Sequence, residues 1–294
     1  MSYLNKVVSL LFLLGPLFLA GDEKEAVDPL PIGNFSVPTV TQVSPLISFG
    51  QLLIGKGALL SQLSGNYAWI EKGYATNVIP NVIYGIIDDL SVFLGIPFSP
   101  KDRIGSFHSS GIEDIFLQWE YRFFNRKRID CTLQATVVAN VQFPTGSSAK
   151  NPPTGNGSFT YFLGTTVAYM SSNWYAFASP GTNLTTSHSG SQTGNSYLYQ
   201  CGVARYIAPL SPKGWIFDFM VEFDGTYSEK NKVHGVKNPN SGGNIIFITP
   251  SIWISSDHLI IQWGVSVPLI QALNGEQKKI ICSTASTLGF GVQF

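Results

Sequence analysis

The feature that most constrains this chain is a long run in which apolar and polar residues alternate. Apolar residues occupy every second position from Ile129 to Phe143, with mostly polar residues between them. This period gives an extended strand one apolar and one polar face. The run is much longer than the typical strand of about five or six residues in a soluble sheet. It suits a tilted strand that crosses a membrane and extends beyond it.

The same period of two recurs at 90–98, 215–223 and 259–267. Each of these segments has an apolar face that two different folds would bury. A soluble β-sandwich would turn it toward a second sheet, whereas a membrane barrel would turn it toward lipid. Alternation alone therefore leaves both folds open.

The lengths of the connections favour the barrel. Strands are expected at 57–72, 78–87, 90–98, 111–124, 129–143, 158–170, 174–180, 196–208, 215–227, 243–254, 258–268 and 282–294. Every second connection is short (88–89, 125–128, 171–173, 209–214 and 255–257), and most others are long and rich in Gly, Ser, Asn and Pro (144–157, 181–195 and 228–242). Outer-membrane barrels show this regular alternation. The sequence predicts an all-β fold, a transmembrane antiparallel up-and-down β-barrel of about 12 strands over 57–294, with short turns in the periplasm.

The composition agrees with a lipid-facing surface. Only 12% of the residues are charged and 13% are aromatic, while 18 basic residues balance 18 acidic ones. A neutral chain lacks the basic excess that binding of nucleic acid requires. Beyond the first 20 residues, no window of about 18 residues stays apolar, so we expect no spanning helix. Strands closed into a barrel are then the available way to cross a lipid bilayer.

The first residues of the chain resemble a targeting signal. Residues 1–20 resemble a signal peptide, with Lys6 before an apolar stretch and small residues at Ala20 and Gly21. Residues 21–56 are acidic at first and rich in proline, and we expect an extended periplasmic leader, with a plug folded back into the pore as the alternative. Together these features predict export by a cleaved signal peptide to the outer membrane of a Gram-negative (diderm) bacterium.

The last strand ends with apolar residues at alternate positions. The pattern resembles the C-terminal signal by which the outer-membrane insertion machinery recognises its barrels, and it consists of Leu288, Phe290, Val292 and Phe294. Aromatic residues near strand ends are expected to form girdles at the lipid boundaries. These are Trp119, Tyr121, Trp174, Tyr175 and Trp215.

Several short motifs occur in an order that resembles a known family. They are Tyr84-Gly85 before the acidic turn Asp88-Asp89, Gly111 with Asp114, Pro144-Thr145-Gly146, Thr249-Pro250-Ser251, Val267-Pro268 and Asn274-Gly275. Together they resemble the outer-membrane β-barrel family named for the MetA pathway of phenol degradation. The resemblance covers most of 57–294 and implies a transporter-like barrel with little indication of mechanism. Ile83 stands where that family has an arginine.

The polar face of the strands should line the lumen. Arg122 is expected near Asp130 across the 125–128 turn, in an ion pair, and Glu120 shares that lining. Another strand carries Asp218, Glu222 and Asp224, which are either structural or a cation-preferring stripe and are our best candidates for solute contact. Phe116 and Phe162 also point inward, with Phe93, Val138 and Leu198, which favours a narrow lumen for small apolar or aromatic solutes.

Three function classes follow from this reading. The leading hypothesis is a channel for passive passage of small, apolar or aromatic solutes, and the alternative is a structural or adhesive protein that presents long extracellular loops. A barrel hydrolase is the third, but His108, His188 and His234 fall in long loops and His258 begins a strand at the periplasmic edge. We expect no enzyme activity, no cofactor and no metal site. The three cysteines, Cys131, Cys201 and Cys282, are interpreted as small apolar side chains.

Overall fold

The computed structural model describes residues 28–50 and 53–293. The wall strands are β1 (Leu59–Ile70), β2 (Gly73–Ile87), β3 (Leu90–Gly95), β4 (Phe98–Ile104), β5 (Phe107–Ile112), β6 (Phe116–Lys127), β7 (Cys131–Gln142), β8 (Thr160–Ser171), β9 (Trp174–Thr185), β11 (Ser196–Tyr206), β12 (Trp215–Ser228), β15 (Gly243–Ser256), β16 (Leu259–Leu273) and β17 (Ile280–Val292). Their period-two pattern explains why they form strands, because each presents one face to the lumen and one to the exterior.

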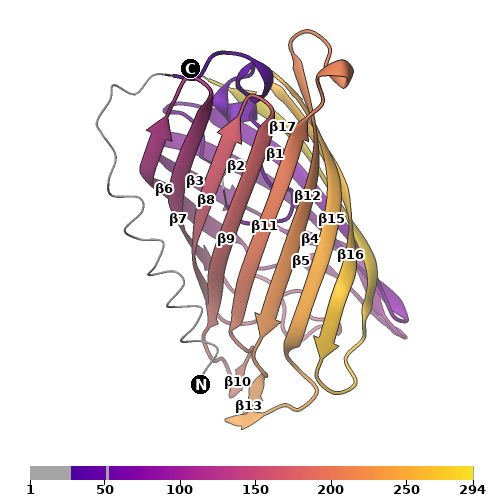
Figure 1. The fold of residues 1–294 in the computed structure, drawn as a ribbon. Coiled ribbons are helices and arrows are strands. Elements are labelled where there is room, and N and C mark those ends of the chain that lie inside the picture. The colour runs from indigo at the N-terminus through magenta and orange to yellow at the C-terminus, as the bar shows by residue number, and fades with distance from the viewer. Residues whose placement is uncertain (1–27, 51–52, 294) are drawn as a thin grey trace, which may run out of the picture.

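These strands form one closed antiparallel barrel (Figure 1). Each strand pairs with its neighbours in chain order, and β1 pairs with both β2 and β17, which closes the sheet on itself. The described chain makes a twelve-stranded barrel, because β3 with β4 and β5 with β6 are each one strand with an interruption. The predicted antiparallel barrel is confirmed.

The interruptions lie where the sequence places proline or loses pairing. Pro97 separates β3 from β4 and cannot donate a ladder hydrogen bond. Beyond it, β4 and β5 continue as a hairpin that pairs Phe98 with Ile112 and Ile104 with Phe107. The long loop expected between 98 and 111 is therefore largely extended structure, and His108 lies on strand β5.

Three other connections also differ from expectation, and in one of them β16, expected to end at 268, continues to Leu273. Strand β2 begins at Gly73, so the first hairpin turns at Glu71 and Lys72 and not across 73–77. Strand β9 extends to Thr185, so the loop expected at 181–195 begins later. Strands β2 and β9 continue past the point where apolar alternation fades, because their ladder partners on β1 and β8 supply the backbone hydrogen bonds.

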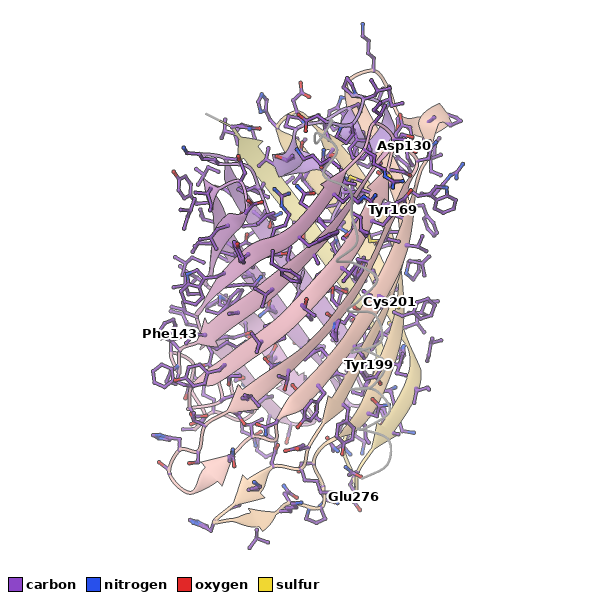
Figure 2. All side chains as sticks on the ribbon, turned by 60° about the vertical axis from the view of Figure 1, so that its left-hand side comes forward. Asp130, Phe143, Tyr169, Tyr199, Cys201 and Glu276 are labelled. Carbon is purple, nitrogen blue, oxygen red and sulfur yellow. The ribbon has the colours of Figure 1, made fainter. Side chains whose placement is uncertain are left out.

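The barrel has two distinct ends. We call the end with the turns after β2, β6, β8, β11 and β15 the short-turn end, and the other the long-loop end. At the long-loop end β10 (Ser191–Gln192), β13 (Lys232–Val233) and β14 (Val236–Lys237) form a small separate sheet, seen at the bottom of Figure 1. In Figure 2, Asp130 lies near the short-turn end and Glu276 near the long-loop end.

The exterior is rich in exposed apolar side chains. Leu163, Phe219 and Leu288 are about half exposed on three different strands, as a lipid-facing surface requires. Of the expected girdle residues, Trp119, Tyr121 and Trp174 are exposed and Trp215 is half-buried, but Tyr175 is fully buried. The prediction for Tyr175 is wrong because the odd-numbered residues of β9 from 175 to 179 face the lumen, where its ring stacks on Phe177.

The helices of the described chain are single turns: η2 (Gly33–Phe35), η3 (Thr39–Thr41) and η4 (Ala208–Leu210). None of them is long and apolar enough to cross a membrane.

At the C-terminus, Leu288 and Phe290 point outward and are exposed, while Phe294 lies outside the described residues. Their role as an insertion signal stays a prediction. The expected signal peptide, 1–20, also lies outside the described residues.

Candidate functional site

The polypeptide that precedes β1 lies inside the barrel. We call residues 28–50 and 53–58 the inner segment; it is the indigo stretch in Figure 1. It hydrogen-bonds to lumen-facing groups on β3, β6, β11, β12, β15 and β16. The described part of the expected leader is therefore not extended in the periplasm, and the plug alternative fits it. Buried hydrogen-bond partners in the lumen outweigh the lack of regular structure that its prolines impose.

The strongest anchor of the inner segment is the carboxylate of Glu222. It accepts hydrogen bonds from three successive backbone N–H groups: Leu46 N at 2.8 Å, Ile47 N at 3.2 Å and Ser48 N at 3.2 Å. The hydroxyl of Ser48 donates to the same carboxylate at 3.3 Å. Successive N–H groups that converge on one anion form a backbone nest. Glu222 is fully buried, so this nest supplies the partners that a buried carboxylate needs.

The neighbouring carboxylates on β12 are also engaged by the inner segment. Asp224 accepts from the Ser48 hydroxyl at 3.2 Å and from the Thr249 hydroxyl at 3.3 Å. Asp218 faces the buried Asn34, whose amide nitrogen, oriented toward the carboxylate, donates at 3.1 and 3.3 Å. The structure thus brings Asp218, Glu222 and Asp224 onto one lumen face as predicted, but their described partners are groups of the protein.

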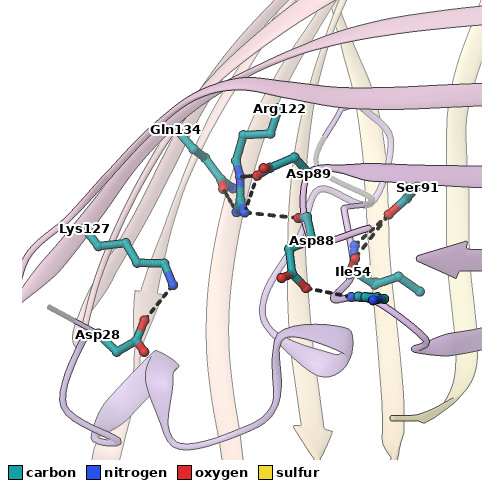
Figure 3. Close-up of polar contacts among 9 residues, drawn as sticks. Asp28, Ile54, Asp88, Asp89, Ser91, Arg122, Lys127 and Gln134 are labelled. Carbon is teal, nitrogen blue, oxygen red and sulfur yellow. Dashed lines mark hydrogen bonds and ion pairs between the residues drawn. The ribbon is translucent and has the colours of Figure 1, made fainter. Parts of the chain in front are cut away.

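Arg122 makes a different ion pair from the one expected. Its guanidinium lies 2.7 Å from Asp89 in the β2–β3 turn and also donates to Asp88 O and to Gln134 (Figure 3). Asp130 is exposed in the turn before β7 and does not meet Arg122. The expected Arg122–Asp130 pair is wrong because the backbone N–H of Arg122 donates to Asp89 O, which sets the turn beside it. Glu120 lies in the lumen and accepts from Thr136 at 2.7 Å.

The short-turn end holds both ends of the inner segment (Figure 3). Lys56 N donates to Asp88 at 2.9 Å, and Ile54 N donates to Ser91 at 3.0 Å. Near the start of the described chain, Lys127 contacts Asp28 at 2.6 Å. The Lys127 ammonium donates a hydrogen bond to this carboxylate and lowers the pKa of Asp28 below its ordinary value. This contact is therefore favoured above the ordinary pKa of an aspartate and is lost as pH falls through the lowered value.

Apolar packing holds the inner segment in addition to its hydrogen bonds. Its buried valines and Ile54 belong to one cluster with lumen-facing side chains of the wall, such as Met220 and Trp253. Val37, Val40 and Val43 are all less than 5% exposed. Burial of each such side chain contributes about 1.5–3 kcal/mol. The inner segment is therefore an integral part of the barrel core and not a loosely held tail.

Phe49 is the aromatic anchor of the inner segment. Its ring packs edge-to-face on Phe162 of β8, with centroids 4.5 Å apart. Gly164 and Gly181 pair across β8 and β9 and leave the space for these rings. A Cβ atom at Gly164 would lie 2.7 Å from the Phe49 ring. Phe162 thus faces the lumen as predicted, and it is covered by the chain itself.

The inner segment separates two cavities. The one toward the short-turn end holds about 460 Å³, and its lining includes the charged residues Asp28, Arg122 and Lys127. The other, which we call the central cavity, holds about 590 Å³. Phe93, Phe116 and Phe247 contribute aromatic walls to it, and the predicted lumen residue Phe116 meets Phe93 edge-to-face at 5.1 Å. The remaining lining is mainly amide, hydroxyl and aliphatic side chains.

The described residues contain no group of three or more His, Cys, Asp or Glu placed to hold a metal ion. His258 lies at the short-turn end, where its Nδ1 is 3.1 Å from Gly291 O. His188 and His234 lie in the long-loop connections. All three cysteines are free thiols, and Cys201 is exposed on the exterior of β11 (Figure 2).

Comparisons with known proteins rest on the fold. No family of known proteins matches the chain, and no curated protein matches it. An outer membrane channel from Pseudomonas putida F1 is similar in structure, with a TM-score of 0.67 at 12% identity over 85% of this chain and 100% of the other.

More distant solved structures are also barrels. The NanC porin has a TM-score of 0.46 at 8% identity, over 80% of this chain and 100% of its own. The translocator domain of the autotransporter NalP from Neisseria meningitidis has 0.43 at 10%, over 85% and 91%. These two are too distant to argue from, and the resemblance to the MetA-pathway family stays a prediction. The Pseudomonas likeness shows that this chain shares the fold of an outer-membrane barrel.

Proposed function

We propose that this protein is a channel of the bacterial outer membrane through which small, uncharged apolar or aromatic solutes move down their gradient. The observation that carries the proposal is the central cavity inside a closed barrel. Its exterior is apolar enough for lipid, and its ladder satisfies the backbone groups that lipid cannot. The fold shared with an outer membrane channel supports this reading.

The lining of the central cavity supports an uncharged solute. Among the described residues, this lining includes no Lys, Arg or His, and Asp224 is its one charged side chain. That carboxylate already accepts hydrogen bonds from Ser48 and Thr249, so it is a poor counter-ion for a cationic solute. An anion would find no basic partner in this described lining. Aromatic walls with a few amide groups are the usual lining of a site for a small, partly apolar molecule.

The inner segment sets how such a solute passes. It crosses the lumen between the two cavities and contacts strands around the barrel. Passage from one cavity to the other therefore requires a local shift of residues near 44–50, where Glu222 holds the backbone. We propose that the inner segment keeps the channel narrow, and that the protein acts by selective permeation and not by catalysis.

Current block in planar lipid bilayers tests this function. We expect the refolded protein to carry a small ionic current that 4-hydroxybenzamide reduces in a saturable manner. The anion 4-hydroxybenzoate, which has the same ring, should block at least about ten-fold more weakly, because the central cavity offers it no cation. Removal of an aromatic wall by Phe116→Ala should weaken the block by the amide and leave the unblocked current in place.

The matched control is Phe123→Ala on the same strand. Phe123 is 59% exposed on the exterior and does not line the cavity. Equal block by the amide and the carboxylate would contradict an uncharged solute class. A correctly folded barrel without any current, in the wild type and in variants that loosen the inner segment, would overturn the channel proposal.

A further inference from the structure

A row of outward-facing side chains crosses the barrel exterior at the long-loop end. Direct cross-strand pairs join Trp69 on β1 to Tyr74 on β2, Tyr74 to Arg103 on β4, and Arg103 to His108 on β5. Residues that pair directly lie on the same face of a sheet. Trp69, Arg103 and His108 are exposed. The row therefore presents two aromatic rings, a guanidinium and an imidazole side by side.

A hollow lies against this row. It holds about 470 Å³ and is lined by Lys72, Gly73, Tyr74, Arg103 and Gly105. Two hairpin turns meet here, because Gly105 N donates to Lys72 O at 2.8 Å and Arg103 Nε donates to Gly105 O at 3.1 Å. A Cβ atom at Gly73 would lie 1.8 Å from Arg103 O, so glycine lets the strands come this close. These contacts hold the backbone of Lys72 beside the hairpin that carries Arg103, and Gly105 O orients the Arg103 guanidinium.

No carboxylate of the described residues lines the hollow. The two carboxylates adjacent to these cations in the sequence have other partners: Asp102 accepts a hydrogen bond from Thr76 N at 2.7 Å, and Glu71 accepts one from Lys279 N at 3.3 Å. Within the described part of the chain, neither Lys72 nor Arg103 forms an ion pair. Two cations without an ion-pair partner at one exterior site favour an anion, and the planar guanidinium suits the oxygens of a phosphate.

The aromatic neighbours place the hollow at a lipid boundary. The Tyr67 ring lies 4.4 Å from that of Trp69 and 5.6 Å from that of Tyr74, centroid to centroid, on the same outward face. Tyr and Trp collect at the level of lipid headgroups because their rings have an apolar body and a polar edge. A free phosphate ion would not contact this apolar surface, whereas a lipid would cover it with its acyl chains or sugar rings.

We infer that Arg103 and Lys72 form a docking site for the phosphorylated headgroup of an outer-leaflet lipid. The inference rests on the proposed function for the placement of the long-loop end at the outer leaflet. The phosphate lies between the guanidinium and the ammonium, and the aromatic row contacts the apolar part of the lipid. Such a lipid holds the β1–β2 and β4–β5 hairpins together at the rim.

Native mass spectrometry of the refolded full chain with diphosphoryl lipid A tests this site. We expect one tightly retained lipid, and about ten-fold weaker retention in Arg103→Gln and in Lys72→Gln. Arg103→Lys should fall between, since an ammonium keeps the charge but loses the planar fork. Phosphatidylethanolamine, which is neutral overall, should be retained weakly by every form.

The matched control is Arg205→Gln. Arg205 is also an exterior arginine beside an aromatic ring, 4.4 Å above Trp174, but it lies at the short-turn end. An equal loss in this variant would mean a general effect of charge and would overturn the site. Displacement of the lipid by millimolar inorganic phosphate would assign the hollow to a free anion instead. Lipid retention is measured without any current, so failure here is distinct from failure of the channel proposal.

Discussion

Replacement of Glu222 by glutamine is expected to increase the open-channel current of the protein. The Glu222→Gln side chain keeps one acceptor, its amide oxygen. Its amide nitrogen is a donor and would face backbone N–H groups that now donate hydrogen bonds to the carboxylate. A buried donor without a partner costs about 1–3 kcal/mol, and this cost weakens the binding of the inner segment to the barrel wall. An energy of that size changes an equilibrium by roughly 5–150-fold. Single-channel recording should therefore show more frequent or longer openings of larger conductance.

The control for this prediction is Glu276→Gln. Glu276 is exposed at the long-loop end and makes no described contact with the inner segment. Both variants must fold, which the shift of electrophoretic mobility on heating reports. If Glu222→Gln conducts like the wild type and like Glu276→Gln, then the backbone nest does not set the width of the channel, and the apolar contacts of the inner segment would have to do so.

Replacement of Trp253 by alanine is expected to cause the largest loss of stability. The Trp253 side chain is 1% exposed, within the apolar cluster that joins the wall to the inner segment. Its Nε1 donates to the Ser255 hydroxyl at 3.0 Å, and that hydroxyl donates to Thr41 O at 2.8 Å. Truncation of a buried tryptophan costs about 3–5 kcal/mol. Urea titration in lipid vesicles, monitored by the circular dichroism signal of the β-strands, measures the change in the free energy of unfolding.

Trp263→Ala is the matched control. Trp263 lies on the adjacent strand β16, pairs directly with Ile252 and is 49% exposed on the exterior. Its truncation removes lipid contacts but leaves no cavity in the lumen, so a clearly smaller loss is expected. Equal losses for the two variants would show that the lumen cluster is not a packed core and that the inner segment is held by its hydrogen bonds alone.

The period of two, together with the alternation of short and long connections, was sufficient to predict the barrel. It locates the long strands β7 and β12 well because each has one face toward the exterior and one toward the lumen, so a shift of one residue would reverse both. The prediction is poorer at the start of β2 and at β4 and β5. There the strands rise to the rim, both faces are exposed to similar surroundings, and the sequence loses its alternation.

The candidate site was predictable only in its wall. Alternation correctly places Glu222, Asp224 and Phe162 in the lumen, but it gives no information on what they contact. One feature of the sequence indicates that this stretch is buried. Val37, Val40 and Val43 are apolar within a proline-rich stretch, and an extended leader would expose them to water. The ion pair of Arg122 with Asp89 was missed because it depends on how the turn between β2 and β3 is aligned with β6 along the barrel axis.

What the sequence alone determined is the closed antiparallel barrel, the number of its strands and, along most of the long strands, the side of the wall on which a residue lies. These follow from local alternation and from connection length, which are properties of the sequence alone. The tertiary structure alone decided that the inner segment fills the lumen, that the carboxylates of β12 bind its backbone, and that two hairpins bring Lys72 beside Arg103. Those contacts join residues distant along the chain, so they depend on the register of the whole barrel and not on any local pattern.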